Sequence, residues 1–250
     1  MPDQPIPAAT LVILRDTPAG PPELLMVERA KAMVFAGGAL VFPGGRIDPG
    51  DHDLAASLGG DADDMAARVA AIRETVEEAG LAIGLVPQPD PAALALLRAA
   101  LHAGTPFAQA LAATGVRLDL NQLTAFARWL PAHAHMRIFD TRFYLARLPE
   151  DAPIASVDET ENVRLLWATA AQVLADADAG RATIIYPTRR NLERLAQFAN
   201  FGEAAAHADA IPVSTITPFV EQRDGRSHLC IPAGLGYPVT SEAMNSAMRG

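Results

Sequence analysis

The stretch from Met65 to Gly80 constrains the fold of this chain more than any other. At about 100° per residue, an apolar stripe runs down one side of a helix over residues 65–79. Three carboxylates lie together on the opposite side, and Gly80 stands where a glycine would end the helix. The stripe consists of Met65, Val69, Ile72, Val76 and Ala79, and the carboxylates belong to Glu74, Glu77 and Glu78. The pattern predicts a helix packed by one face that presents three carboxylates on the other.

Two interpretations fit this acidic face. Glu-rich faces are usually solvated, and Arg73 with Glu77 forms an ordinary i,i+4 pair. Clustered carboxylates also repel one another, and a hard divalent cation relieves that repulsion. The upstream residues 42–45, Phe-Pro-Gly-Gly, favour the second interpretation. A glycine pair lets the backbone approach a cation and a phosphate closely.

Together these segments resemble the box shared by Nudix hydrolases. That box is a glycine, five residues, a glutamate, seven residues, and then Arg-Glu-aliphatic-x-Glu-Glu-x-Gly-aliphatic. Residues 73–81 (RETVEEAGL) are similar to its second half, and residues 44–51 (GGRIDPGD) to its first half. Asp51 stands where the family has its first glutamate, and residues 52–72 fill a gap that is 14 residues longer than in the family.

The resemblance implies a Nudix α/β/α sandwich, a mixed β-sheet between helices, in one domain over residues 1–250, with the box at 44–81. It implies an enzyme, a metal-dependent diphosphatase that uses Mg²⁺ or Mn²⁺. The metal ligands would be Glu74, Glu77, Glu78 and the Gly45 carbonyl. The general base would be Glu161, Glu159 or Glu74. Asp51, Arg73 and Gly80 would be structural, with Arg73 bridging Asp51 and the helix.

The residues before the box indicate a substrate class. The family members that cleave coenzyme A and its thioesters carry an arginine, a spacer and Gly-x-Val-x-Phe-Pro-Gly-Gly. Arg29 and residues 38–45 (GALVFPGG) are similar, with Leu40 at the valine position. A substrate site would then include Arg29, Gly44 and Gly45. Hydrolysis of CoA or acyl-CoA would yield 3′,5′-ADP and (acyl-)4′-phosphopantetheine. The alternatives are an ADP-ribose or nucleotide-sugar diphosphatase, and a catalytically inactive Nudix domain that serves as a ligand sensor.

Two insertions are expected around this core. Residues 52–64, inside the box, are polar and rich in Gly and Asp, which predicts an exposed loop. Residues 91–130 show helical apolar spacing in two groups, which predicts a helical insert of two or three helices. The groups are Leu94, Leu97 and Leu101, and then Leu120, Leu123, Phe126 and Leu130. Hairpins are expected near Thr17–Pro22 and around residues 224–226.

Composition limits the partners. The net charge is −9 and Lys31 is the only lysine, which argues against a nucleic-acid-binding surface. No apolar run is long enough for a membrane span. The single cysteine, Cys230, fits a reducing cytoplasm. The expected partner is therefore a small nucleoside diphosphate in the cytoplasm, and the oligomeric state stays open between a monomer and a homodimer.

Overall fold

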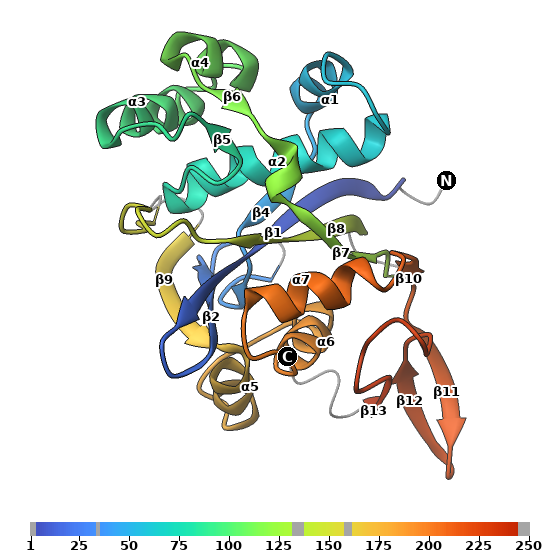
Figure 1. Cartoon of the computed structure of the whole chain (residues 1–250). Helices are drawn as coiled ribbons and strands as arrows, with labels where there is room; N and C mark the ends of the chain where they lie inside the picture. Colours follow the sequence, from blue (N-terminus) through green and yellow to red (C-terminus); the bar gives the residue numbers. More distant parts are fainter. Residues whose placement is uncertain (1–3, 34–35, 132–137, 158–161, 245–250) are drawn as a thin grey trace.

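A mixed β-sheet divides the molecule into two helical layers (Figure 1). The structure, a computed structural model, describes residues 4–33, 36–131, 138–157 and 162–244. Within these ranges the main strands follow the order β10-β7-β8-β1-β2-β3, with β4 paired to β1 and β9 paired to β2. The strands are β1 (Ile6–Thr17), β2 (Gly20–Arg29), β3 (Leu40–Val41), β4 (Gly44–Arg46), β7 (Thr124–Trp129), β8 (Phe139–Arg147), β9 (Asn162–Thr169) and β10 (Thr215–Ile216).

Strand β1 shows how the two cores arise. It pairs in parallel with β8 and antiparallel with β2 and β4, so it lies in the interior of the sheet. Its successive side chains point to opposite faces. Leu11 and Ile13 enter one apolar core, whereas Val12 and Leu14 enter the other. A strand buried on both faces reads as a continuous apolar run, which is the pattern at residues 11–14.

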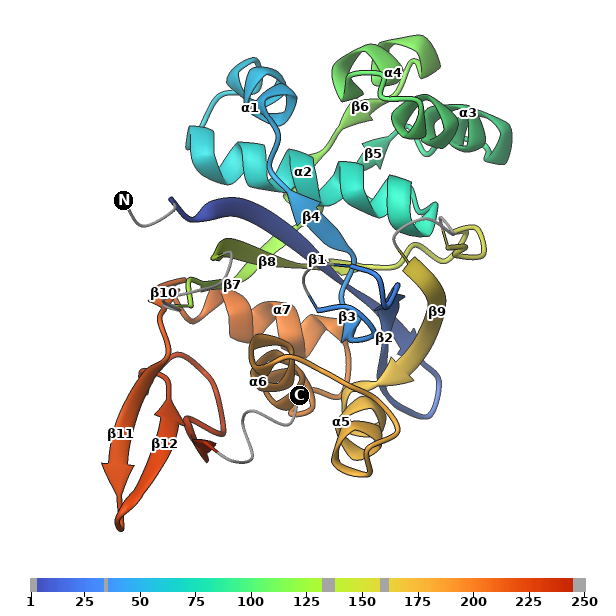
Figure 2. The ribbon, with the colours of Figure 1, turned by 180° about the vertical axis from the view of Figure 1, so that it is seen from behind.

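Each face of the sheet carries its own helices (Figure 2). The expected α/β sandwich is therefore confirmed. The first layer holds α1 (Pro49–Ala56), α2 (Ala62–Ala79), α3 (Pro91–His102) and α4 (Phe107–Thr114), and the second holds α5 (Ala170–Asp178), α6 (Tyr186–Leu195) and α7 (Phe201–Asp209). None of the helices in the described ranges has the length and apolar character to cross a lipid bilayer.

Helix α2 begins three residues before Met65 and ends at Ala79. Gly80 has a φ of 64° and donates its N–H to the Val76 carbonyl, so it ends the helix as predicted. The prediction of a single buried face is wrong. Thr75 and Glu78, outside the predicted stripe, are buried as well. Glu78 is covered by the starts of β4 and β9, where it contacts Gly44 and Asn162, and α1 and α3 also pack against α2.

The insertion inside the box is partly helical, so the loop predicted over residues 52–64 is wrong. Helix α1 covers residues 49–56, and α2 begins at Ala62. Local signals explain both helices. Pro49 occupies the first turn of α1, where its missing N–H costs nothing. The Asp61 side chain accepts hydrogen bonds from the N–H groups of Asp63 and Asp64 and so caps α2.

The helical insert is shorter than predicted. It contains the two helices α3 and α4, and the second of them ends at Thr114. The chain then forms the short strand β6 (Arg117–Leu118), paired with β5 (Leu85–Val86), a 3₁₀ turn over Leu120–Gln122, and the strand β7. The three-residue spacing of Leu123 and Phe126 reflects strand alternation, because these two side chains enter opposite cores. Pairing with β8 therefore overrides the helical spacing.

Both predicted hairpins are present. The first joins β1 and β2. The second joins β11 (Phe219–Arg223) to β12 (Arg226–Cys230), and β13 (Ser241–Ala243) completes a small separate sheet. Tyr237 anchors this C-terminal part, because its hydroxyl donates to Asn191 of α6 and accepts from the Trp129 indole.

Candidate active site

Glu78 lies in a buried junction between α2, β4 and β9. One oxygen, Oε2, accepts a hydrogen bond from the Gly44 N–H (2.8 Å), and Oε1 accepts from the Asn162 side-chain amide (2.9 Å). A Cβ at Gly44 would lie only 2.4 Å from the Ala9 carbonyl oxygen, so this tight turn excludes any side chain. The box glycine thus brings its backbone N–H directly to a box carboxylate.

Glu74 packs against the second glycine of the pair. A Cβ at Gly45 would lie 2.3 Å from Glu74 Oε1, inside the van der Waals contact distance. Burial raises the pKa of Glu74, the positive charge of Arg73 opposes that rise, and the charges of Glu78 and Glu77 add to it, so the pKa reaches about 8. Burial therefore favours the protonated form of Glu74 in the cation-free protein.

Arg73 ties the two halves of the box together. Its Nε and Nη2 donate to the two carboxylate oxygens of Asp51 (3.0 and 2.9 Å), and Nη2 also donates to the Arg46 carbonyl (2.9 Å). Its Nη1 donates to Glu74 (2.9 Å) and Glu77 (3.0 Å). Burial lowers the pKa of Arg73, but the hydrogen bond that Arg73 donates to Asp51 and the surrounding negative charges outweigh that effect and raise it.

The oxygen atoms around this junction are suitable ligands for a hard divalent cation. Carboxylate and carbonyl oxygens are the ligands that Mg²⁺ and Mn²⁺ prefer, and Glu74, Glu78 and the Gly44–Gly45 backbone meet there. Yet among the described residues, no three His, Cys, Asp or Glu side chains stand as they would around a metal ion. Glu77 instead bonds to Arg73. Since the three carboxylates repel one another, a cation would have to draw them together.

Arg29 is connected to Glu78 through the pairing of two strands. It ends β2 and is the register partner of Asn162 in β9, and Asn162 donates to Glu78. Sequence reasoning misses Asn162, because that hydrogen bond joins residues 84 positions apart and belongs to no motif. The predicted bases Glu159 and Glu161 lie outside the described residues.

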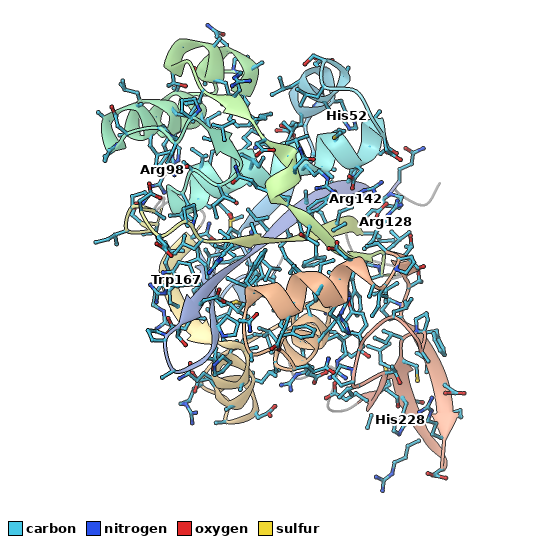
Figure 3. The ribbon with its side chains drawn as sticks, in the orientation of Figure 1. His52, Arg98, Arg128, Arg142, Trp167 and His228 are labelled. Atoms are coloured by element: carbon cyan, nitrogen blue, oxygen red, sulfur yellow. The ribbon has the colours of Figure 1, made fainter. Side chains whose placement is uncertain are left out.

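Arg98 is a second residue that sequence reasoning misses. It comes from α3 and lies at the C-terminal end of α2 (Figure 3). Its guanidinium donates to the main-chain carbonyl oxygens of Glu77 and Glu78. The helical spacing of the apolar residues predicts α3 itself, but not which polar residue of α3 would meet α2.

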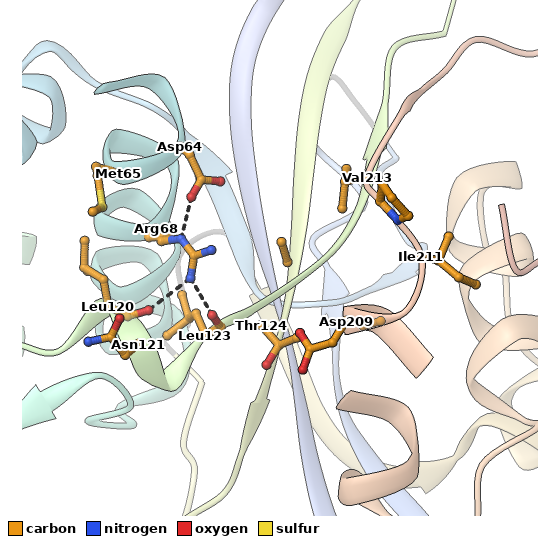
Figure 4. Close-up of a pocket in the computed structure, with 13 residues that line it drawn as sticks. Asp64, Met65, Arg68, Leu120, Asn121, Leu123, Thr124, Asp209, Ile211 and Val213 are labelled. Carbon is orange, nitrogen blue, oxygen red and sulfur yellow. Dashed lines mark hydrogen bonds and ion pairs between the residues drawn. The ribbon is translucent and has the colours of Figure 1, made fainter. Parts of the chain in front are cut away.

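A pocket of about 590 Å³ opens elsewhere, beside the first turns of α2 (Figure 4). The Arg68 side chain donates to Asp64 and to the carbonyl oxygens of Leu120 and Leu123 on one wall. Asp209 lies on the other wall. None of Glu74, Glu77 and Glu78 lines this pocket, so it is separate from the junction around the box carboxylates.

Comparisons with known proteins identify the family of this chain. A family model described as the NUDT19 Nudix domain matches residues 56–195. The structure of a NUDIX hydrolase from Alicyclobacillus acidocaldarius is 31% identical, covers 81% of this chain and 96% of its own, and superposes with a TM-score of 0.69. A MutT protein from Methanosarcina mazei Go1 is 14% identical over 78% of this chain and 96% of its own, with a TM-score of 0.44.

The NUDIX domain of Shewanella oneidensis NrtR, solved with ADP ribose, is 12% identical over 72% of this chain and 85% of its own, with a TM-score of 0.40. No curated protein matches the chain. The family model and the Alicyclobacillus structure define an enzyme that hydrolyses nucleoside diphosphate derivatives. The chain belongs to the Nudix hydrolase family, whose members generally use divalent cations.

Proposed function

We propose that this enzyme hydrolyses the diphosphate linkage of CoA or acyl-CoA with Mg²⁺ or Mn²⁺, releasing 3′,5′-ADP and (acyl-)4′-phosphopantetheine. The observation that carries the proposal is the contact of two box carboxylates with the box glycines. Glu78 accepts from the Gly44 N–H, and Glu74 lies where a side chain at Gly45 would be. Oxygen ligands of this kind can hold a cation that binds the diphosphate, and glycine backbone lets the phosphate groups come close.

In this proposal Glu74, Glu77, Glu78 and the Gly45 carbonyl hold the cation. When bound, it would neutralise the diphosphate and make a water molecule more acidic. Arg73 holds Glu74 and Glu77 through one nitrogen while Asp51 fixes its other side. Asn162 fixes the orientation of the Glu78 carboxylate.

The general base is proposed among Glu161, Glu159 and Glu74. A base must be deprotonated before it accepts a proton from the attacking water. A bound cation would lower the raised pKa of Glu74, so that pKa does not rank the three candidates. Substitution of each glutamate by glutamine, followed by a pH–rate profile, separates them.

The choice of CoA rests on the segment before the box. Arg29 and residues 38–45 resemble the pattern of the CoA-cleaving members. The register of β2 with β9 brings Arg29 beside Asn162, and Asn162 is the residue whose side chain donates to Glu78. Arginine is well suited to a phosphate contact there, because its planar guanidinium can donate two hydrogen bonds at once.

The test is product analysis by ion-pair chromatography. Purified protein is incubated with CoA, acetyl-CoA, a long-chain acyl-CoA, dephospho-CoA, ADP-ribose, NADH or UDP-glucose, each with Mg²⁺ or Mn²⁺, with EDTA and without enzyme. We expect 3′,5′-ADP from CoA, acetyl-CoA and the long-chain acyl-CoA only with a cation, whereas cleavage of dephospho-CoA would give AMP because it lacks the 3′-phosphate. AMP from ADP-ribose, or UMP from UDP-glucose, without 3′,5′-ADP would overturn the CoA assignment. Binding without turnover of any substrate would favour the ligand sensor.

A further inference from the structure

The C-terminal end of α2 carries an unfavourable concentration of negative charge. The carbonyl end of a helix has a partial negative charge, which acidic side chains make worse and basic ones relieve. Glu77 and Glu78 lie in the last turn of α2, and that turn holds no basic residue. Arg73 of the same helix pairs with the Glu77 side chain, so a positive charge for the carbonyl groups of the last turn has to come from another element.

Arg98 of α3 supplies that charge. Its Nε donates to the Glu77 carbonyl oxygen (2.9 Å), and its Nη2 donates to the Glu78 carbonyl oxygen (3.2 Å). The His102 ring, one turn further along α3, contacts the same Glu77 carbonyl oxygen (3.1 Å). The last carbonyl groups of a helix have no partner within it, so Arg98 provides hydrogen-bond partners for the main chain of two of the three box glutamates.

The same guanidinium also binds the segment that follows β8. Its Nη1 donates to Ser156 Oγ (2.7 Å), and its Nη2 donates to the Ser156 carbonyl oxygen (2.8 Å). The Ser156 N–H in turn donates to the Ala79 carbonyl oxygen (3.0 Å). In the sequence, Ser156 precedes Glu159 by three positions and Glu161 by five.

Gly80 leaves the space that this arrangement needs. A Cβ at Gly80 would lie 2.9 Å from Arg98 Nη1 and 3.4 Å from Ser156 Oγ. The glycine therefore ends α2 and admits the arginine at the same point. Three segments that are distant in the sequence, α2, α3 and the chain at Ser156, meet at one side chain.

We propose that Arg98 is a positioning residue of the diphosphatase site. Its side chain connects the helical insert to Ser156 and to the end of α2 that bears Glu77 and Glu78. The inference rests on the proposed function, since it assigns Arg98 to the same site. Its consequence is that the insert sets the geometry of the box carboxylates through their main chain, without contact of Arg98 with substrate.

The experiment compares Arg98→Met, which keeps the length and loses the charge, with Arg98→Lys, which keeps the charge and loses the fork of donors. Arg181→Met is the control, because Arg181 is exposed and its side chain pairs with Asp176 far from the box in sequence. We expect kcat of Arg98→Met to fall by about 10- to 100-fold, with KM within about threefold of the wild type. The kcat of Arg98→Lys should lie between those of Arg98→Met and the wild type, and the kcat of Arg181→Met should equal that of the wild type.

Two measurements do not depend on turnover. Hydrogen exchange of the Ser156 N–H should become faster in Arg98→Met, and the Mn²⁺ concentration for half-saturation, followed by the EPR signal of free Mn²⁺, should rise by about 10-fold. If the wild type cleaves no substrate, the proposed function fails, and these two measurements still decide the role of Arg98. If Arg98→Met does not fold, Arg98→Lys and Ser156→Ala take its place.

A kcat of Arg98→Met within about twofold of the wild type would overturn the proposal. An unchanged rate of hydrogen exchange at the Ser156 N–H in Arg98→Met would also overturn it. A third contrary result would be an equal loss of activity in Arg98→Met and Arg98→Lys, accompanied by an equal loss of thermal stability in both variants.

Discussion

Asp51 performs, with a shorter side chain, the bridging role that the family resemblance implies for a glutamate. It is 1% exposed, and both of its carboxylate oxygens accept from Arg73. Its Oδ2 also accepts the Asp48 N–H at the start of α1. Because α1 begins at Pro49, the added helix carries the carboxylate up to Arg73. The side chain of Asp51 is one methylene shorter than that of a glutamate, and the position of the α1 backbone still brings its carboxylate within hydrogen-bonding distance of Arg73.

Replacing Asp51 by asparagine should therefore destabilise the protein strongly. The amide cannot accept both donors of Arg73, and a buried guanidinium would lose its charge partner. We expect a loss of about 3–5 kcal/mol in the free energy of unfolding, measured with urea. Asp53→Asn, on the exposed side of the same helix, should stay within about 0.5 kcal/mol of the wild type. Equal stability of the two variants would contradict the bridge.

Glu78→Gln should lower the rate of diphosphate hydrolysis by at least about 100-fold. The sequence pattern places this carboxylate on an open face, but the structure buries it between two donors, Gly44 and Asn162. A glutamine amide nitrogen would face one of these donors, so stability should also fall by about 1–3 kcal/mol. Turnover by the product assay, with thermal unfolding beside it, separates the two effects. Glu150→Gln, at an exposed turn, is the control.

At the scale of whole elements, α6 joins the C-terminal sheet to the core through one shared cation. Arg190 is buried, and its Nη2 donates both to Glu193 in α6 (2.9 Å) and to Glu242 in β13 (2.8 Å). Burial raises the pKa of Glu193, the charges of Arg190 and Arg189 oppose the rise, and the result is about 7. Two carboxylates thus compete for one guanidinium nitrogen.

This arrangement makes stability depend on pH. The pKa of Glu193 is higher in the folded protein than its ordinary value of 4.5, so its contribution is full below pH 4.5 and is lost as pH rises through about 7. Between pH 5 and pH 8 the wild type should lose about 1–3 kcal/mol relative to Glu193→Gln. Urea unfolding at both pH values measures the difference. A constant difference across that range would refute the shifted pKa.

Elements with local signals could be predicted, and elements that depend on distant partners could not. Gly80 ends α2 because a glycine readily adopts the left-handed conformation. The Asp224-Gly225 pair turns the late hairpin for the same reason. By contrast, β7 is a strand because β8 pairs with it, although Leu120, Leu123 and Phe126 have helical spacing. Tertiary pairing is invisible to periodicity.

The candidate site divides in the same way. The residue types of Glu74, Glu77 and Glu78 and their spacing stand in the sequence as a motif. Asn162 and Arg98 do not, since their contacts with α2 depend on where β9 and α3 pack. Motifs record the chemistry that a short segment carries itself, whereas supporting residues come from any element that the fold brings near.

For the molecule as a whole, the sheet separates two apolar cores, and the helices of the box, α1 and α2, lie on only one face of it. Binding of a cation at the box should raise the stability of the entire domain by linkage. At a free Mn²⁺ concentration of 100 times its Kd, the gain is about 2.7 kcal/mol, which corresponds to a rise in Tm of several degrees. Differential scanning fluorimetry with Mn²⁺, and then with excess EDTA, measures it. Glu78→Gln should show a much smaller rise, and an equal rise would place the ion elsewhere.

The exposed turn between α1 and α2 has a use in protein engineering. Residues 57–61 connect two independently capped helices, and nothing lies within 4 Å of a Cβ built at Gly59. At 1.5 Å per residue, Glu74 lies about 18 Å along α2 from Ala62. A fluorescent reporter or new chain termini introduced at Gly59 would thus interrupt the box in sequence while leaving its carboxylates in place. The gap that hides this motif from a pattern search is also where the chain can be opened.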